Sequence, residues 1–250
     1  MTRVNPWFPL GIDPDARYRL FCLPHAGAGA SNFYAWGKGL GPEISACPVQ
    51  PPGRERRQRE QPFTSVAPLA GELARTIAAS VAGPFALFGH STGALVVFET
   101  ARELRRIRGP RPSWLFVSGR RAPQTPTEWH DVAAMELPEF SDFLRKLGGT
   151  PEGLLEDLDT LEYLQPLLAA DFSVNERYAY TPEEPLDIPI TAFAGVEDSG
   201  ADVADMAPWE LQTTAGFRLH PLEGGHFAVF DRAAEVHRAI GADLAGGGQP

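Results

Sequence analysis

A serine between two glycines stands at residues 89–93, Gly-His-Ser-Thr-Gly, where an apolar run meets an amphipathic segment. The preceding residues 85–89 read as a buried strand, and residues 92–109 have helical spacing. On so sharp a strand-to-helix turn the hydroxyl of Ser91 is lifted out of the sheet, and the flanking glycines avoid steric clashes. The new helix directs its first N–H groups at developing negative charge. The pattern predicts nucleophilic acyl-transfer chemistry at Ser91, with the N–H of Thr92 as an oxyanion donor.

The attacking hydroxyl needs a base, and a histidine after Ser91 is expected, because the chain order in this architecture is serine, acid, histidine. His226, in LEGGHFAVF, follows the last expected strand in a glycine loop, where an imidazole can reach over the sheet edge. His130 begins a helical insertion and His220 lies inside an expected strand. His237 lies in the final helix, where we expect a side chain exposed to solvent. His226 is therefore the predicted base.

The acid that orients this base is expected in the loop after the penultimate strand, residues 190–195. Asp198 lies three residues beyond that strand, where its carboxylate can reach the far nitrogen of His226 and hold its tautomer. Glu197 and Asp202 are the competing acids. An acidic loop that is exposed to solvent and has no catalytic part is the alternative interpretation.

A second oxyanion donor is expected from the small-residue loop LPHAGAGAS, residues 23–31, which follows the first expected strand. The small side chains let the backbone approach a substrate carbonyl. We assign the donor to the N–H of Ala26, since the turn directly after His25 is the first available one. A glycine-rich turn that only clears space is the alternative, and neither phosphate-binding glycine motif, G-x-x-x-x-G-K-[ST] or G-x-G-x-x-G, is present.

Strands alternate with helices in the pattern that must position these groups. Apolar, β-rich runs recur at 18–24, 46–50, 85–89, 114–119, 190–195 and 217–222, with amphipathic helical segments at 66–83 and 92–109. Continuous apolar strands that alternate with helices predict an α/β fold, a mainly parallel sheet covered on both faces. Residues 125–180 break the rhythm with helical stretches around 138–147, 151–158 and 160–176. We interpret them as a helical lid inserted into a single domain of residues 1–250.

Apolar residues recur at helical spacing within the expected lid. Six of them are candidates for lining an acyl tunnel: Phe140, Phe143, Leu144, Leu147, Leu164 and Leu168. At this spacing, ordinary packing of the lid on the body of the protein is the favoured interpretation.

Composition narrows the classes of protein to which the chain can belong. Its 250 residues, 43% hydrophobic and 22% charged, are typical of one globular domain. The net charge of −10 argues against sequence-independent nucleic-acid binding. Without a signal peptide or a run of 18 apolar residues, we expect a soluble cytoplasmic protein that spans no membrane. Cys22 and Cys47 lack metal-binding spacing and are expected to be buried free thiols.

Six blocks in order carry a resemblance to a known family: LFCLPHAGAGAS, PPGRERR, FGHSTGALVVFE, LGGTPEGLLED, LLAADFSVNERYAY and LEGGHFAVF. From about residue 7 to 240 the chain resembles the type II thioesterases of polyketide and non-ribosomal peptide biosynthesis. The resemblance implies the α/β-hydrolase fold and the triad Ser91, Asp198 and His226. It also implies hydrolysis of acyl groups from the phosphopantetheine thiol of carrier proteins, chiefly to clear mis-loaded or stalled synthase modules.

Two positions depart from the family's pattern. Thr92 stands where methionine is usual, which keeps the backbone N–H but makes the pocket wall smaller and more polar. In the lid the family commonly has L-R-A-D, whereas residues 168–171 of this chain are Leu-Ala-Ala-Asp. The missing arginine puts a lid contact in doubt and leaves the chemistry intact.

The resemblance implies that acyl or peptidyl carrier proteins are the partners of a free-standing enzyme, which we expect to be a monomer. Such carriers are typically acidic, as this chain is, so the overall charge repels them. Residues 53–59, GRERRQR, and 102–108, RELRRIR, are the basic clusters able to attract them locally. Side chains merely exposed to solvent are the favoured interpretation of both clusters.

The expected reaction is attack of Ser91 on the thioester carbonyl with His226 as base, followed by hydrolysis of the acyl-enzyme. It needs no metal or organic cofactor. A carboxylesterase of small free esters, an acyltransferase or cyclase with the same triad, and a non-catalytic scaffold docked on a synthase are the alternatives.

Overall fold

The computed structural model describes residues 5–127 and 131–246, so that His130 lies outside the described residues. Within them, six parallel strands form one sheet in the order β2-β1-β3-β4-β5-β6. The strands are β1 Tyr18–Leu23, β2 Ile44–Pro48, β3 Phe85–His90, β4 Trp114–Ser118, β5 Ile190–Gly195 and β6 Phe217–Leu222. The predicted parallel sheet is confirmed. Four central strands, β1, β3, β4 and β5, are buried along their whole lengths, as strands between two helical layers are.

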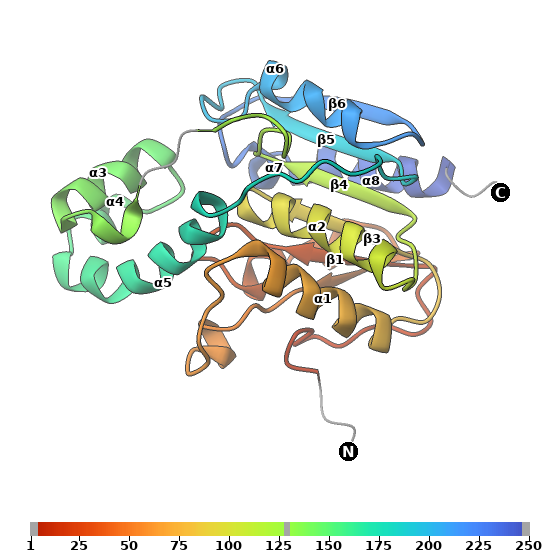
Figure 1. The fold of residues 1–250 in the computed structure, drawn as a ribbon, viewed down its shortest axis with the longest axis horizontal. Coiled ribbons are helices and arrows are strands. Elements are labelled where there is room, and N and C mark those ends of the chain that lie inside the picture. Colours follow the sequence, from red (N-terminus) through yellow and green to blue (C-terminus); the bar gives the residue numbers. More distant parts are fainter. Residues whose placement is uncertain (1–4, 128–130, 247–250) are drawn as a thin grey trace.

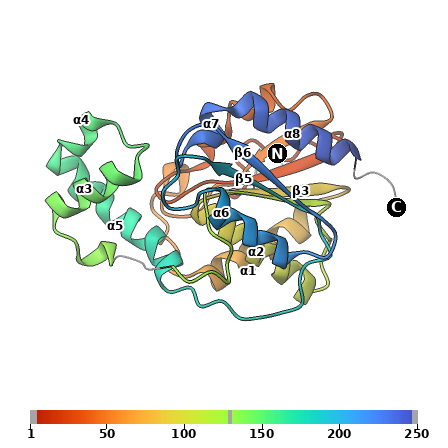
Figure 2. The same cartoon turned by 90° about the horizontal axis from the view of Figure 1, so that it is seen from above.

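Helices cover both faces of this sheet (Figure 2). On one face lie α1 Val66–Ser80 and α2 Thr92–Arg106, whose apolar residues form one core cluster together with α6 Val203–Met206 and the 3-10 helix η5 Ala207–Gln212. On the other face, α8 Ala233–Gly246 shares a second cluster with α7 Ala228–Asp231 and the 3-10 helices η1 Ala30–Phe33 and η2 Trp36–Lys38. The layers are those that the alternating pattern predicts.

Several element ends differ from the sequence expectation. Strand β2 is Ile44–Pro48 instead of 46–50, because it pairs with β1 from Tyr18 opposite Ile44 onward. Helix α1 ends at Ser80 instead of 83, since Val81 already has extended backbone angles. Helix α2 ends at Arg106 instead of 109, because Arg108 adopts a left-handed φ of 54° and the chain turns back there.

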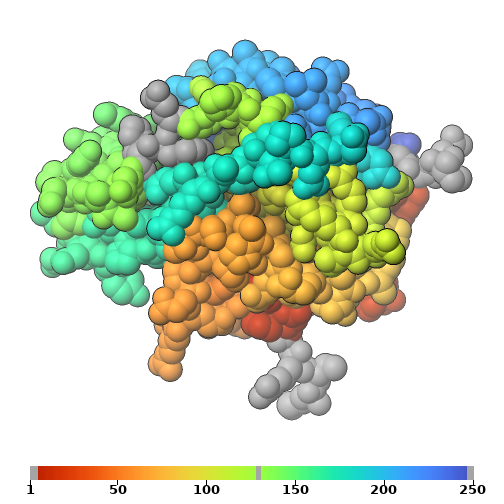
Figure 3. Space-filling view, in the orientation of Figure 1, coloured from red at the N-terminus to blue at the C-terminus, as the bar shows by residue number. Residues whose placement is uncertain are grey.

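Between β4 and β5 the described residues include four helices and no strand of the sheet. The helices are the 3-10 helix η4 Val132–Ala134, α3 Leu137–Leu147, α4 Glu152–Leu155 and α5 Leu158–Glu176. This helical insertion, residues 132–176, projects from the body of the molecule (Figures 1 and 3). Its own apolar cluster includes Phe140 and Leu144, which are 0% and 4% exposed. Helix α4 is shorter than the expected 151–158, and α5 begins two residues before the expected 160.

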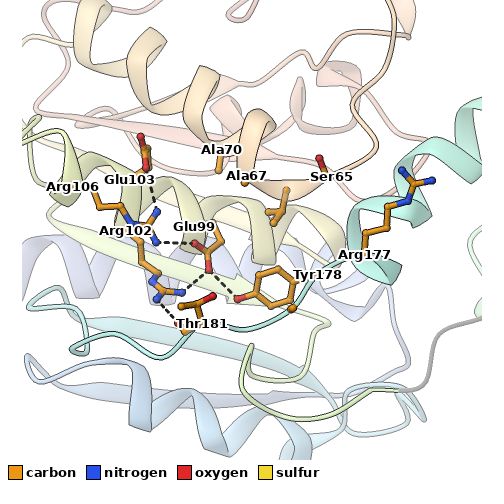
Figure 4. A pocket seen from close by; sticks show the side chains of 12 residues that line it. Ser65, Ala67, Ala70, Glu99, Arg102, Glu103, Arg106, Arg177, Tyr178 and Thr181 are labelled. Carbon is orange, nitrogen blue, oxygen red and sulfur yellow. Dashed lines mark hydrogen bonds and ion pairs between the residues drawn. The ribbon is translucent and has the colours of Figure 1, made fainter.

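The favoured interpretation of the two basic clusters, exposure to solvent, is wrong for three of their arginines, Arg54, Arg57 and Arg102. Arg102 is 2% exposed and pairs with Glu99 at 2.7 Å. Tyr178 donates a hydrogen bond to the same carboxylate at 2.9 Å, beside a cavity of about 330 Å³ between α1, α2 and the chain after α5 (Figure 4). Arg54 and Arg57, near the 3-10 helix η3 Glu55–Arg57, are also buried. Buried arginines need partners. Arg102 has one on its own helix, Glu99, and one in a distant segment, Glu183.

Other buried side chains include the cysteines and one histidine. Cys22 and Cys47 are free and buried, as predicted, and burial raises the pKa of the Cys47 thiol to about 12. His237 is 7% exposed, because its ring packs 4.8 Å from that of Trp36 between centroids. The expectation of a solvent-exposed His237 is therefore wrong. Among the described residues, no helix has both the length and the apolar character needed to cross a bilayer.

Candidate active site

Ser91 sits on a strained turn at the carboxyl end of β3. Its φ of 54° and ψ of −119° are unusual for a residue with a side chain, and its N–H donates to the carbonyl of Ser118 at 2.8 Å. A Cβ atom at Gly89 would collide with the backbone of Gly93, and one at Gly93 would collide with the carbonyl of Leu23. Both glycines are therefore required by close backbone approach. Such strain costs about 1–3 kcal/mol and is held by the surrounding structure.

Asp198 and His226 are brought together by the ends of β5 and β6. The Nδ1 atom of His226 lies 2.8 Å from Oδ2 of Asp198. The other oxygen, Oδ1, accepts the N–H groups of Gly200 and Ala201 at 2.9 and 3.2 Å. Burial acts to raise the pKa of Asp198, but the hydrogen bonds from His226 and from the two amides outweigh it and lower that pKa. The carboxylate is therefore ionised and fixed in orientation at neutral pH.

The competing acids lack the burial of Asp198, which is 5% exposed. Glu197 and Asp202 are exposed, and the Asp202 side chain caps α6 by accepting the N–H of Asp205 at 2.9 Å. Of the three candidates, Asp198 is the one whose carboxylate is hydrogen-bonded to His226. His220 lies in β6, as expected.

The imidazole of His226 reaches the residue that precedes Ser91. Its ring centroid is 4.9 Å from that of His90, at the end of β3. Both rings border Gly119, where an added Cβ would lie 2.6 Å from His90 Cε1 and 3.2 Å from His226 Cε1. Gly119, which follows β4 with a φ of 60°, thus leaves the space through which His226 approaches the turn. Sequence reasoning missed this glycine, because its neighbours come from two distant loops.

His25 and His90 lie together beside the base, His90 fully buried and His25 partly buried. Their ring centroids are 5.5 Å apart, and His90 Nδ1 lies 2.7 Å from Ser118 Oγ. Burial, with smaller contributions from neighbouring histidines, lowers the pKa of His25 to about 4 and that of His90 well below its usual value. Both are neutral at pH 7. Among the described residues, no three His, Cys, Asp or Glu side chains are grouped as a metal ion would require.

The lowered pKa values of His25 and His90 predict a loss of stability in mild acid. In the unfolded chain they titrate near pH 6.5, whereas the folded state resists protonation, so the unfolded state binds more protons as the pH falls below about 6.5. The free energy of unfolding should fall by up to about 1.4 kcal/mol per pH unit for each such group. Urea denaturation at pH 7, 6 and 5 measures this slope, and H25Q should reduce it. An equal free energy of unfolding at pH 7 and pH 5 would contradict the assignment.

The loop at residues 23–31 places its backbone against the start of α2. Ala26 and Thr92 border the same small cavity of about 20 Å³. No hydrogen bond between described residues engages the N–H of either one. The loop itself is held from outside: the Gly27 N–H donates to Asp171 at 2.6 Å, and the Ala30 N–H donates to Gln50 at 3.1 Å. The two predicted donors therefore lie near each other with their N–H groups available.

The apolar residues considered for an acyl tunnel pack within the helical insertion. Phe140 and Leu144 belong to its buried cluster, and Phe143, Leu147 and Leu168 pack on that cluster from partly buried positions, as does Ala26 of the body. Leu164 is also partly buried. Leu168 reaches the loop that bears Ala26, since its Cδ2 lies 2.5 Å from the position that a Cβ at Gly27 would take.

The chain is similar to known proteins over nearly its whole length. Residues 18–244 match the family described as thioesterase domain. The chain is 40% identical over 237 residues to the gramicidin S biosynthesis protein GrsT of Aneurinibacillus migulanus, covering 94% of this chain and 93% of that one. The thioesterase RedJ, from the prodiginine biosynthetic pathway in Streptomyces coelicolor, superposes with a TM-score of 0.84 at 35% identity over 93% of this chain and 92% of RedJ. BorB, a type II thioesterase from the borrelidin biosynthetic cluster, gives 0.86 at 31% identity over 98% and 100%.

Proposed function

The chain belongs to the thioesterase domain family and has the α/β-hydrolase fold, and from this we propose that it hydrolyses acyl thioesters on the phosphopantetheine arm of carrier proteins. It would act as a free-standing type II thioesterase that clears mis-loaded or stalled modules of a polyketide or non-ribosomal peptide synthase. Nearly full-length similarity to a gramicidin S biosynthesis protein and to the solved type II thioesterase BorB supports this function.

The proposed catalytic triad is Ser91, His226 and Asp198. The hydroxyl of Ser91 attacks the thioester carbonyl while His226 accepts its proton, and the same proton passes to the departing thiolate sulfur. Water then attacks the acyl-enzyme, giving its proton to His226, and the Ser91 oxygen leaves and is reprotonated. The observation that carries the proposal is the 2.8 Å hydrogen bond between His226 and Asp198, beside a serine on a strained strand-to-helix turn.

The proposed oxyanion hole consists of the N–H groups of Ala26 and Thr92. Both are backbone donors beside one small cavity, so they cost no reorganisation when charge develops on the carbonyl oxygen. Each donor should contribute about 3 kcal/mol of transition-state stabilisation.

We further propose that residues 125–180 act as a lid within a single domain, and that Leu168 is the insertion side chain that meets the acyl group nearest the oxyanion hole. The enzyme is proposed to be a cytoplasmic monomer. Its net charge of −10 supports a partner other than nucleic acid.

The test compares one acyl group on three carriers: a phosphopantetheinylated carrier protein, a short pantetheine thioester and a small oxygen ester. Intact mass of the carrier protein reports its deacylation, and trapping of the acyl-enzyme reports the covalent step. We expect kcat/KM to be about tenfold or more higher for the carrier-bound group, because contacts remote from the thioester contribute to transition-state binding. Equal or faster hydrolysis of the ester would favour a carboxylesterase. Transfer of the acyl group to an added amine or alcohol instead of water would favour an acyltransferase.

A further inference from the structure

The last turns of α5 present three side chains to the body of the protein. Leu168, Asp171 and Asn175 are separated by three and four residues, so they lie on one face of the helix. That end of α5 lies next to the start of α2 (Figure 1). The three side chains contact both segments that carry the proposed oxyanion donors.

Asp171 holds the loop that bears Ala26. It is 6% exposed, and its Oδ2 accepts the N–H of Gly27, the next residue after Ala26, at 2.6 Å. The buried Arg54 binds both oxygens of this carboxylate, at 2.5 and 2.8 Å, and also donates to the carbonyl of Ala28 at 3.4 Å. The ion pair therefore contacts the loop at two points, the N–H of Gly27 and the carbonyl of Ala28.

Asn175, one turn further along α5, holds the start of α2. Its Nδ2 donates to Thr92 Oγ1 at 2.7 Å, and its Oδ1 accepts from Arg120 at 2.6 Å. Asn175 is 2% exposed. The threonine hydroxyl is the acceptor in this contact, so the residue that supplies one proposed donor is itself tied to α5.

The body of the protein fixes only part of this arrangement. The carbonyls of Leu23 and Pro24 pack directly against Gly93. Beyond them the chain passes through Gly27, whose φ of 79° gives it the freedom of a glycine turn. Contacts of Asp171 and Arg54 with this turn add to its own hydrogen bond, Ala28 N–H to the His25 carbonyl at 3.2 Å, in setting the position of the Ala26 N–H relative to that of Thr92.

We propose that α5 is a positioning element for the oxyanion hole: Asp171 and Asn175 fix the two backbone donors at the separation that a tetrahedral oxyanion requires. Neither side chain touches substrate. The inference rests on the proposed function, since it assumes Ser91 chemistry and the donors Ala26 and Thr92. Because α5 belongs to the helical insertion, full activity then requires this insertion to be docked on the body of the protein.

T92V tests the Asn175 contact, because it removes Oγ1 while keeping the size of the side chain and the backbone N–H. T100V is the matched control: Thr100 is buried on the same helix, and its hydroxyl bonds the carbonyl of Val96. We expect T92V to lower kcat about tenfold with KM nearly unchanged, and T100V to keep the wild-type rate. Addition of N175D to T92V should cost little more, because it removes the donor of the same contact and keeps an oxygen for Arg120.

The Asp171 contact is tested by D171L combined with R54M, which removes both charges and so avoids leaving one of them buried without its partner. We expect kcat to fall about 10- to 100-fold while the urea midpoint shows a folded protein. D171L alone should unfold more readily than the pair. A folded double variant with wild-type kcat would overturn the proposal for this contact.

An alkyl trifluoromethyl ketone separates positioning from general damage, because it forms a tetrahedral oxyanion adduct with the serine. Its inhibition constant should rise in T92V by the same factor as kcat/KM falls, while the affinity for a non-hydrolysable thioether analogue stays constant. Unchanged ketone inhibition in T92V would overturn the positioning role and leave the triad standing. An adduct that still forms in S91A would instead contradict the proposed function itself.

Discussion

S91A is expected to abolish thioester hydrolysis, with kcat about 10⁴- to 10⁶-fold below wild type. The substitution removes the attacking oxygen and leaves the carbonyl to direct attack by water. Alanine also remains at the left-handed φ of 54°, so the turn keeps its shape only under the same backbone strain. Single-turnover deacylation of an acyl carrier protein measures the loss.

S113A is the matched control for this change, because Ser113 is an exposed serine just before β4. It should keep full activity, and neither variant should lose the cooperative thermal transition. A folded S91A enzyme with more than about one hundredth of the wild-type kcat would exclude covalent catalysis at this serine.

D198N should lower kcat by about 10⁴-fold without unfolding the protein. Oδ1 of Asp198 already accepts two backbone N–H groups, so the new amide will keep its oxygen there and turn its NH₂ toward His226. That NH₂ favours the imidazole tautomer with the proton on Nε2, which cannot accept the proton of Ser91. The kcat of D198N across the pH range, with the same acyl thioester, measures the effect.

The two competing acids supply the controls for D198N. E197Q and D202N change exposed carboxylates and should alter kcat by less than about twofold, as changes in screened surface charge do. If E197Q lost more activity than D198N, the acid of the triad would have to be reassigned to Glu197.

Local sequence was sufficient to predict the sheet and the turn at Ser91. Buried parallel strands are continuous apolar runs, and the glycines at 89 and 93 mark a backbone approach that no side chain permits. The ends of elements were less predictable, since pairing with β1 decides where β2 begins. The position after β5 was enough to place the acid in the loop that meets His226, because the carboxyl ends of parallel strands share one edge, and the structure shows the contact at Asp198.

Long-range polar contacts were beyond the reach of local patterns. Arg54 is buried because Asp171, 117 residues away, neutralises it, and Arg102 is buried by Glu99 together with Glu183. Each of the two basic clusters in the sequence therefore contributes an arginine to internal ion pairs. The signal available for α5 was the spacing of Asp171 and Asn175 on one helical face. Their partners, on the loop after β1 and on α2, became evident only in three dimensions.

The backbone of Ser91 also bears on how such a chain evolves. The left-handed φ of Ser91 lowers the stability of the protein, and a glycine at this position would relieve that strain. Selection for folding alone would therefore favour loss of the hydroxyl. Persistence of a serine on this turn is thus a signature of a trade-off between stability and activity. In a lineage that no longer needs the reaction, we expect glycine to replace this serine and the free energy of unfolding to rise.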